Sequence, residues 1–287
     1  MADLSRSGMK HRFSLEIPIR PYLRDHCVEG KTVFPAVESL AALAGEVRNH
    51  CPGAPLNWLK DANFPRMLVL PSDVDAQPAQ IEIEEKADGI QASLQTTVTA
   101  KNSSIRRTLE HARVIFVRKN ALPETAVPFP EAWKLRGAPL FVSADSIYRE
   151  LVPFGLSYRN IAGNLTVAGD GALAEISGGS GEAEDTLLGS PFVSDAMMHA
   201  ACVWGQRFAG IVAFPIGFDR RVIHRATKTG EIYFARVTPT DVGSGILRFD
   251  AWIFDRQERL CESVCGLRMS DIFRGRLQPP HWIREGI

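Results

Sequence analysis

The sequence predicts an α+β fold made of two similar units, each a curved antiparallel sheet around one long helix. Each half of the chain has a single long helical stretch with an apolar face, and segments typical of antiparallel strands accompany it. Because one helix cannot cover both faces of a sheet, the economical packing curves each sheet around its helix and sets the units side by side. We expect an N-terminal unit over residues 1–120, a linker over 121–138 and a C-terminal unit over 139–287.

The first half contains a helix that begins after Pro35 and ends at Cys51-Pro52-Gly53. Its apolar residues recur at helical spacing: Val37, Leu40, Ala41, Ala44 and Val47. Residues 90–98 then alternate between apolar and polar, which is the pattern of a half-buried strand. A polar turn at 101–104 leads to a return strand around 112–116. Prolines and a glycine between residues 120 and 138 indicate the linker.

The second half repeats this order of elements without evident sequence identity to the first. Gly169-Asp170-Gly171 lies between two strand-like segments and is a strong hairpin signal. Residues 192–208 predict the second helix. Further strands are expected at about 231–237, 246–254 and 260–269. A site built from both halves would lie in the cleft between them.

The composition excludes several classes of function. The 33 basic and 33 acidic side chains cancel, so no global field favours nucleic acid or an anionic membrane. The first ten residues lack the apolar core of a signal peptide, and no apolar run approaches the roughly 20 residues that span a bilayer. Five cysteines without a Cys-x2-Cys pair argue against a disulfide framework or a zinc site. We therefore expect a cytoplasmic protein without metal or cofactor, and without a nucleic-acid or membrane partner.

His26, Gly30 and Pro35 stand at His-x3-Gly-x4-Pro spacing directly before the first helix. A histidine there can transfer a proton, and a glycine lets the backbone come close to a ligand. Proline suits the first turn of a helix. That helix would aim its unpaired N–H groups at the group on which His26 acts, with the N–H of Ala36 the best placed. Asp25, the residue before His26, is expected to point away as a solvated neighbour.

Asp195 is the candidate acid or base in the second half. It follows Ser190-Pro191 early in the second helix, and His199 lies one helical turn later on the same face. A carboxylate beside an apolar face is costly unless it has a partner. The alternative is that Asp195 only favours the helix N-terminus, which is common.

Together the two motifs resemble the dehydratase domain of modular polyketide synthases, a family whose fold is a double hotdog. The resemblance extends from about residue 12 to about residue 275. Weaker matches are Tyr148 through Gly155-x-x-Tyr158 and the segment 214–218. The chain departs from the family pattern at Ala36, where the family has glycine, and at residues 159–162, which replace Gly-Pro-x-Phe.

The resemblance implies a free-standing dehydratase that removes water from a 3-hydroxyacyl thioester and gives a 2-enoyl thioester in polyketide or fatty-acid-type biosynthesis. His26 would take the C2 proton as general base. Asp195, protonated or bridging, would deliver a proton to the departing 3-hydroxyl. Tyr158 would orient the hydroxyl or the Asp195 carboxyl. The substrate-binding residues implied by the resemblance are Gly30, Pro35, Ala36, Tyr158 and His199.

Two other functions stay open from the sequence. The first is an aldol cyclase of the product-template kind, which would keep the fold and the two residues and have a larger, rounder pocket. The second is a non-catalytic acyl-binding scaffold, in which His26 and Asp195 would lie too far apart to cooperate. The expected partner is an acyl thioester on an acyl carrier protein or on coenzyme A. A homodimer is compatible with this site but not required, because one chain supplies both halves.

Overall fold

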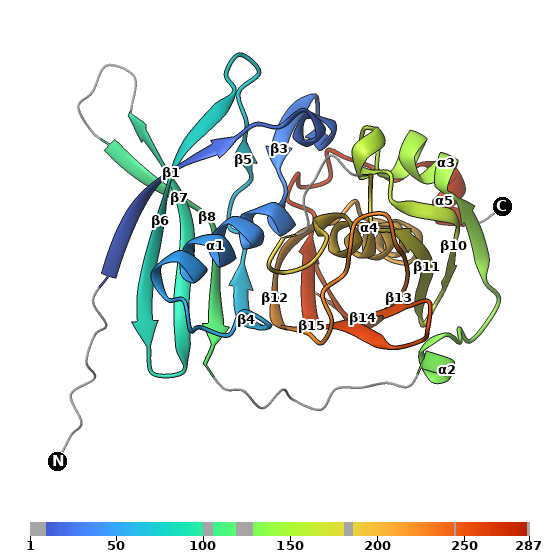
Figure 1. The fold of residues 1–287 in the computed structure, drawn as a ribbon. Coiled ribbons are helices and arrows are strands. Elements are labelled where there is room, and N and C mark those ends of the chain that lie inside the picture. The colour runs from blue at the N-terminus through green and yellow to red at the C-terminus, as the bar shows by residue number, and fades with distance from the viewer. Residues whose placement is uncertain (1–9, 100–105, 119–128, 181–185, 244, 286–287) are drawn as a thin grey trace.

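The computed structural model describes residues 10–99, 106–118, 129–180, 186–243 and 245–285. Two long helices, α1 (Ala36–His50) and α4 (Pro191–Phe208), lie in the middle of the molecule, and antiparallel strands curve around each of them (Figure 1). The two helices contact one another. This is the double hotdog fold expected from the sequence. Among the described residues, no helix is long and apolar enough to cross a membrane.

The N-terminal half places five strands on the outside of α1, in the sheet order β1-β6-β7-β8-β4. The short strands β2, β3 and β5 form a separate small sheet. The elements of this half besides α1 are, in chain order, β1 (Lys10–Pro18), the 3₁₀ turn η1 (Pro21–Asp25), β2 (Cys27–Val28), β3 (Lys31–Phe34), β4 (Trp58–Asn63), β5 (Leu68–Val69), β6 (Ala76–Lys86), β7 (Gly89–Thr99) and β8 (Arg106–Val117).

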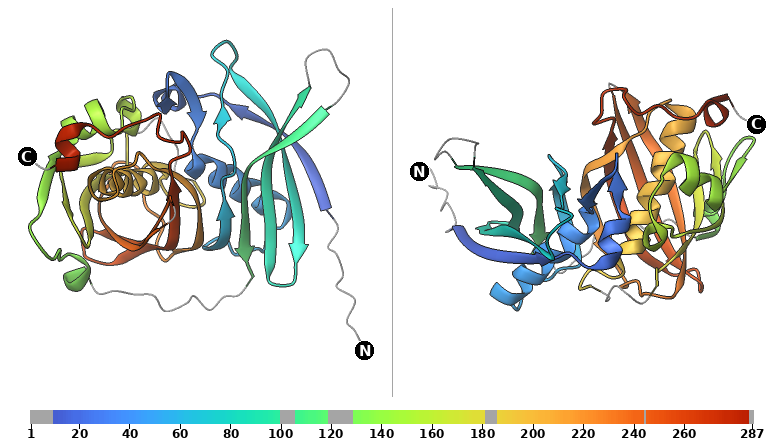
Figure 2. Two further views of the ribbon diagram at one scale, coloured as in Figure 1. Left: turned by 180° about the vertical axis from the view of Figure 1, so that it is seen from behind. Right: turned by 90° about the horizontal axis from the view of Figure 1, so that it is seen from above.

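The C-terminal half continues the same sheet in the order β12-β15-β14-β13-β11-β10-β9, because β4 pairs antiparallel with β12. The two views of Figure 2 show the two curved halves meeting along this seam. Its elements besides α4 are, in chain order, α2 (Phe129–Ala132), β9 (Leu140–Ser143), α3 (Ala144–Ser146), the π turn η2 (Ile147–Leu151), the 3₁₀ turn η3 (Leu156–Tyr158), β10 (Ile161–Ala168), β11 (Gly171–Ser177), β12 (Phe214–Ile223), β13 (Ile232–Gly243), β14 (Ile246–Asp255), β15 (Leu260–Ser270) and α5 (His281–Glu285).

Helix α1 is held by its apolar face. Leu40, Leu43 and Val47 are fully buried, and the helix contacts β6, β7 and β8. Pro35 precedes the helix with an extended backbone, which suits the fixed φ of proline at a helix start. The helix ends where Cys51 donates its N–H to the carbonyl oxygen of Val47 at 2.8 Å.

Two substitutions on α1 are expected to change stability in opposite directions. Leu43→Ala should lower the free energy of unfolding by about 2–5 kcal/mol, because it removes a fully buried side chain and leaves a cavity. Gly45→Ala should raise it by up to about 1 kcal/mol, because alanine is the better helix former and its Cβ would meet no neighbouring atom within 4 Å. Urea denaturation of both variants checks this. An unchanged free energy of unfolding in Leu43→Ala would contradict the packing described for α1.

The structure differs from the sequence expectations in several elements. Strands β1 to β6, β9 and β12 were not expected. In the first half, strands were expected only after the helix, but β1, β2 and β3 precede α1. The turn expected at 101–104 lies outside the described residues, as do residues 121–128 of the expected linker. Residues 129–132 form the short helix α2, where Phe129 stacks on Trp133 at a ring distance of 5.5 Å.

Candidate active site

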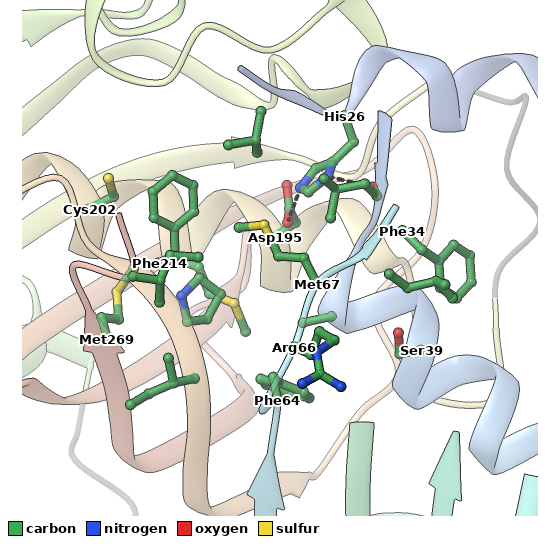
Figure 3. A pocket seen from close by; sticks show the side chains of 18 of the residues that line it. His26, Phe34, Ser39, Phe64, Arg66, Met67, Asp195, Cys202, Phe214 and Met269 are labelled. Atoms are coloured by element: carbon green, nitrogen blue, oxygen red, sulfur yellow. Dashed lines mark hydrogen bonds and ion pairs between the residues drawn. The ribbon is translucent and has the colours of Figure 1, made fainter. Parts of the chain in front are cut away.

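A cavity of about 370 Å³ lies between the two halves of the molecule. Most of its lining is apolar, and Figure 3 shows the side chains that project into it, with His26 and Asp195 pointing toward one another. His26 comes from the segment before α1, and Asp195 and His199 come from α4. The cavity therefore brings together the two motifs that the sequence singled out in separate halves.

One ring nitrogen of His26 is hydrogen-bonded to the backbone, and the other faces Asp195. Its Nδ1 lies 2.8 Å from the carbonyl oxygen of Val33. A carbonyl only accepts hydrogen bonds, so Nδ1 carries the hydrogen and the lone pair of the neutral ring is on Nε2. Nε2 faces Asp195, with 4.0 Å to its Oδ1. Burial lowers the pKa of His26 below its ordinary value, although the Asp195 carboxylate opposes this. The imidazole is thus a neutral base near pH 7.

Asp195 lies on the face of α4 that lines the cavity. Met198, His199 and Cys202 follow it at i+3, i+4 and i+7 and line the same cavity. Asp195 is 6% exposed, and its carboxyl stands between two histidines, with Oδ2 at 2.9 Å from Nε2 of His199. Despite this short distance, neither Oδ2 nor Nε2 has an aligned hydrogen-bond partner among the described residues. Burial raises the pKa of Asp195, but His199 and then His26 outweigh it and hold the pKa below its ordinary value.

Tyr148 orients His199 from the other side. Its hydroxyl accepts a hydrogen bond from the Ile161 N–H at 2.8 Å and lies 3.3 Å from Nδ1 of His199. Burial raises the pKa of Tyr148, so the phenol keeps its proton. The Asp195 carboxylate only accepts hydrogen bonds and lies 2.9 Å from Nε2 of His199, so Nδ1 is the nitrogen left to accept from the Tyr148 hydroxyl. The N–H of His199 is then on Nε2, beside Asp195. The sequence analysis named Tyr148 only in a weak motif match, with Gly155 and Tyr158, and did not predict its contact with His199. That spacing was the one feature of the sequence that pointed to Tyr148.

The residues expected around the His26 motif separate into two groups. Ala36 is the first residue of α1 and lines the cavity. Pro35 sets up the helix start, and its carbonyl oxygen accepts from the Ser39 N–H at 3.0 Å. Gly30 lies in the exposed turn between β2 and β3 with φ of +72°, a conformation that suits glycine. It makes that turn and is not among the residues that line the cavity.

Tyr158 and Asp25 also differ from expectation. Tyr158 is fully buried and does not line the cavity; its ring packs behind His26 at 5.0 Å. Its hydroxyl has no hydrogen-bond partner among the described residues. Burial, then Glu38 and Asp195, raise the pKa of Tyr158 well above its ordinary value. Asp25 was wrongly expected to be a solvated neighbour, because its carboxylate accepts hydrogen bonds from Ser157 of the other half.

The described residues contain no cluster of three or more His, Cys, Asp or Glu side chains arranged to hold a metal ion. All five cysteines are free thiols. Cys202 lines the cavity, and burial raises its pKa to about 11, so this thiol is protonated and behaves as part of the apolar wall.

Comparison with known proteins agrees with the geometry. A family model described as "Polyketide synthase dehydratase N-terminal domain" matches residues 130–279, just over half of the chain, a range that includes Asp195 but not His26. A curated relative is one of the subunits of the polyunsaturated fatty acid synthase of Thraustochytrium sp., with 26% identity over 232 residues. The match covers 77% of this chain and only 8% of that protein's length.

Solved dehydratase domains share the fold. The dehydratase domain of the CurK module of curacin polyketide synthase is 21% identical, with a TM-score of 0.72 over 94% of this chain and 95% of that domain. The dehydratase domain of a mycocerosic acid synthase-like polyketide synthase is 16% identical, with a TM-score of 0.70 over 93% and 92% of the two chains. Two further structures of the CurK dehydratase are described as inactive mutants, one with a histidine replaced by phenylalanine and one with an aspartate replaced by asparagine.

Proposed function

The chain belongs to the polyketide synthase dehydratase family of hydro-lyases, and on that premise we propose that it removes water from a 3-hydroxyacyl thioester through His26 and Asp195. One observation carries the proposal. His26 and Asp195, the proton-transfer groups that the sequence predicts in separate halves, line the same cavity. Nε2 of His26, which carries the lone pair, lies 4.0 Å from Oδ1 of Asp195. Elimination of water requires a base that reaches C2 and an acid that reaches the 3-hydroxyl of the same acyl chain.

In the first step, Nε2 of His26 takes a proton from C2 of the acyl chain. The electron pair of the broken C–H bond moves toward the thioester carbonyl, whose oxygen gains negative charge. The N–H of Ala36 stabilises that charge, because the first N–H groups of a helix have no partner within it. Ala36 lines the cavity at the start of α1, which supports this role.

In the second step, the C3–O bond breaks, the C2=C3 double bond forms and the hydroxyl leaves as water. The hydroxyl needs a proton, and Asp195 is ionised at rest because its pKa lies below the ordinary value. Once His26 has taken the C2 proton on Nε2, it shares that proton with Oδ1 of Asp195, 4.0 Å away, and Asp195 passes it to the leaving hydroxyl; the two groups titrate as a pair. His199 holds the carboxyl on its other side at 2.9 Å. The proton taken from C2 thus leaves with the water.

The scaffold alternative requires His26 and Asp195 to be far apart, and the 4.0 Å distance does not favour it. No observation in the described residues favours the cyclase alternative specifically. The histidine and aspartate replacements described as inactive in the CurK dehydratase support a catalytic pair of the same residue types in this chain.

The direct test uses purified protein with 3-hydroxyacyl and 2-enoyl thioesters, each on an acyl carrier protein and on coenzyme A. The proposal predicts that the protein interconverts the two thioesters, with loss or gain of one water by mass spectrometry. Tight acyl binding without interconversion on either carrier would refute it.

We propose an acyl carrier protein as the donor and Arg66 as the residue that binds the phosphate of its phosphopantetheine arm. Arg66 is exposed and lies on the rim of the cavity (Figure 3). Its guanidinium makes no ion pair or hydrogen bond with any residue that the structure describes. A guanidinium can bind phosphate through two parallel hydrogen bonds.

Arg66→Ala is expected to raise KM about 10- to 150-fold for phosphopantetheine thioesters, with little change in kcat, because a charge-assisted hydrogen bond contributes about 1.5–3 kcal/mol. Thioesters that lack the phosphate should be unaffected by the substitution. Arg66→Lys, which keeps the charge but not the paired donors, should fall between wild type and Arg66→Ala. An equal KM change with and without the phosphate would contradict this role.

We also propose the division into an N-terminal hotdog (1–120), a linker (121–138) and a C-terminal hotdog (139–287). The curvature of separate groups of strands around α1 and α4 supports it. A cytoplasmic location is proposed as well, because five free thiols persist in a reducing compartment.

A further inference from the structure

Asp25, the residue before His26, is hydrogen-bonded to a loop of the second half, residues 154–158. The N–H and Oγ of Ser157 both donate hydrogen bonds to Asp25 Oδ2, at 2.8 and 2.7 Å. The N–H of Gly155 donates to the main-chain oxygen of Asp25 at 2.8 Å. Three hydrogen bonds thus join residues that are far apart in the sequence.

The fastened loop carries the two rings that enclose the His26 imidazole. The ring of Phe154 lies 4.3 Å from the imidazole and the ring of Tyr158 lies 5.0 Å from it, measured between ring centres. The approach of the loop depends on Gly155, because a Cβ at that position would lie 2.3 Å from Asp25 Oδ1. The loop therefore fits closely against Asp25 and has no room for a side chain.

We propose that Asp25 is a positioning residue for the reaction, which keeps Phe154 and Tyr158 against His26 by holding Gly155 and Ser157. Asp25 does not touch the substrate cavity; it acts through the loop. The inference rests on the proposed function in one respect, the use of His26 as the base. Its structural part, the control of the surroundings of the imidazole, does not depend on turnover.

Other charged and titratable groups also face His26 or its enclosing rings. Asp195 and His199 face it from α4, and Tyr158 faces it from η3. Glu38 of α1 acts on Tyr158 by its charge, and its carboxyl accepts a hydrogen bond from Tyr22 at 3.0 Å. Substitutions at Asp25 and Gly155 do not remove any of these groups. An effect on the pKa of His26 that both variants share is therefore due to the change in how the loop encloses the imidazole.

The test uses three variants: Asp25→Ala, Gly155→Ala and Asp25→Asn. The two alanine variants release or displace the loop, and we expect them to lower kcat about 10- to 100-fold with little change in KM, because the base is no longer held in the reacting geometry. Asp25→Asn keeps an oxygen that can accept from Ser157, and we expect near wild-type rates.

The pH dependence separates positioning from mere loss of stability. Burial lowers the pKa of His26, so water reaching the ring should return the pKa toward its ordinary value. The acidic limb of the kcat/KM profile should then move to higher pH in both alanine variants. Loss of the Asp25 charge alone would move it to lower pH. Gly155→Ala keeps that charge, so an upward shift in both variants identifies the loop as the cause.

A direct readout keeps this test independent of turnover. Titration of His26 by NMR should show the same upward shift of its pKa in Asp25→Ala and Gly155→Ala, even if no substrate is turned over. Asp255→Ala is the matched control, because Asp255 also accepts backbone N–H groups, from Gln257 and Arg259, but does not line the cavity. An unchanged His26 titration in both alanine variants, or an equal shift in Asp255→Ala, would overturn the proposal.

Discussion

Replacement of His26 by alanine is expected to lower the rate of dehydration by about 100- to 10,000-fold, the range that a positioned general base contributes. The substitution removes the lone pair of Nε2, which faces the cavity because Nδ1 contacts the carbonyl oxygen of Val33. Acyl binding should persist, since most of the cavity wall is apolar and stays in place. Initial rates and acyl-binding affinity, measured on the same preparation, check both parts.

The pH profile of the wild-type enzyme tests the role of His26 as base in a second way. Because burial lowers the pKa of His26, the base stays neutral through pH 7, and the rate should fall only as the pH drops through this lowered pKa. His281→Ala is a suitable control, since His281 is exposed and pairs only with Glu285 near the end of the described chain. A His26→Ala enzyme that retains wild-type rates would rule out the proposed base.

Asp195→Asn is expected to lower the rate by a similar factor, about 100- to 10,000-fold, with little loss of acyl binding. The amide has the shape of the carboxyl but cannot carry the shared proton to the leaving hydroxyl. The substitution also removes the negative charge that raises the pKa of His26. The acidic limb of the residual activity should therefore move to lower pH, opposite to the shift expected for the Asp25 and Gly155 alanine variants.

The control for Asp195→Asn is Asp145→Asn, which changes an exposed carboxylate that pairs with Arg149 on the surface. It should leave rate and pH profile unchanged. If Asp195→Asn lowered the rate without moving the acidic limb, the charge coupling between Asp195 and His26 would be contradicted. If it lowered neither, the acid role would be contradicted as well.

The helices and the β10–β11 hairpin could be predicted because their signals are local. The apolar spacing of α1 and α4 reflects buried faces, and Gly169-Asp170 forms the turn between β10 and β11, with Gly171 as the first residue of β11. Strand β6 was missed although Ile81 and Ile83 alternate with charged residues, because Pro78 and the carboxylates are uncommon in a strand. These carboxylates are accommodated by a contact that is not local, since Lys10 of β1 pairs with Glu82 at 2.8 Å.

The proposed catalytic pair, His26 and Asp195, could be singled out from the sequence because each residue stands in a motif with its own spacing, one in each half. The contacts around the pair could not be predicted. The hydrogen bonds of Asp25 with Ser157 and of Tyr148 with His199 join residues whose proximity depends on how the chain packs. Nothing in the neighbouring sequence distinguishes a solvated Asp25 from one that accepts two hydrogen bonds. In the same way, Gly30 reads as a ligand-contacting glycine until its turn is seen.

The most direct test of the central claim is hydration of a 2-enoyl thioester in water labelled with deuterium and heavy oxygen. The account predicts that the wild-type protein places heavy oxygen at C3 and deuterium at C2 of the 3-hydroxyacyl product, and that His26→Ala and Asp195→Asn place neither at a comparable rate. A wild-type protein that binds the thioester and leaves it unlabelled at both carbons would contradict the account.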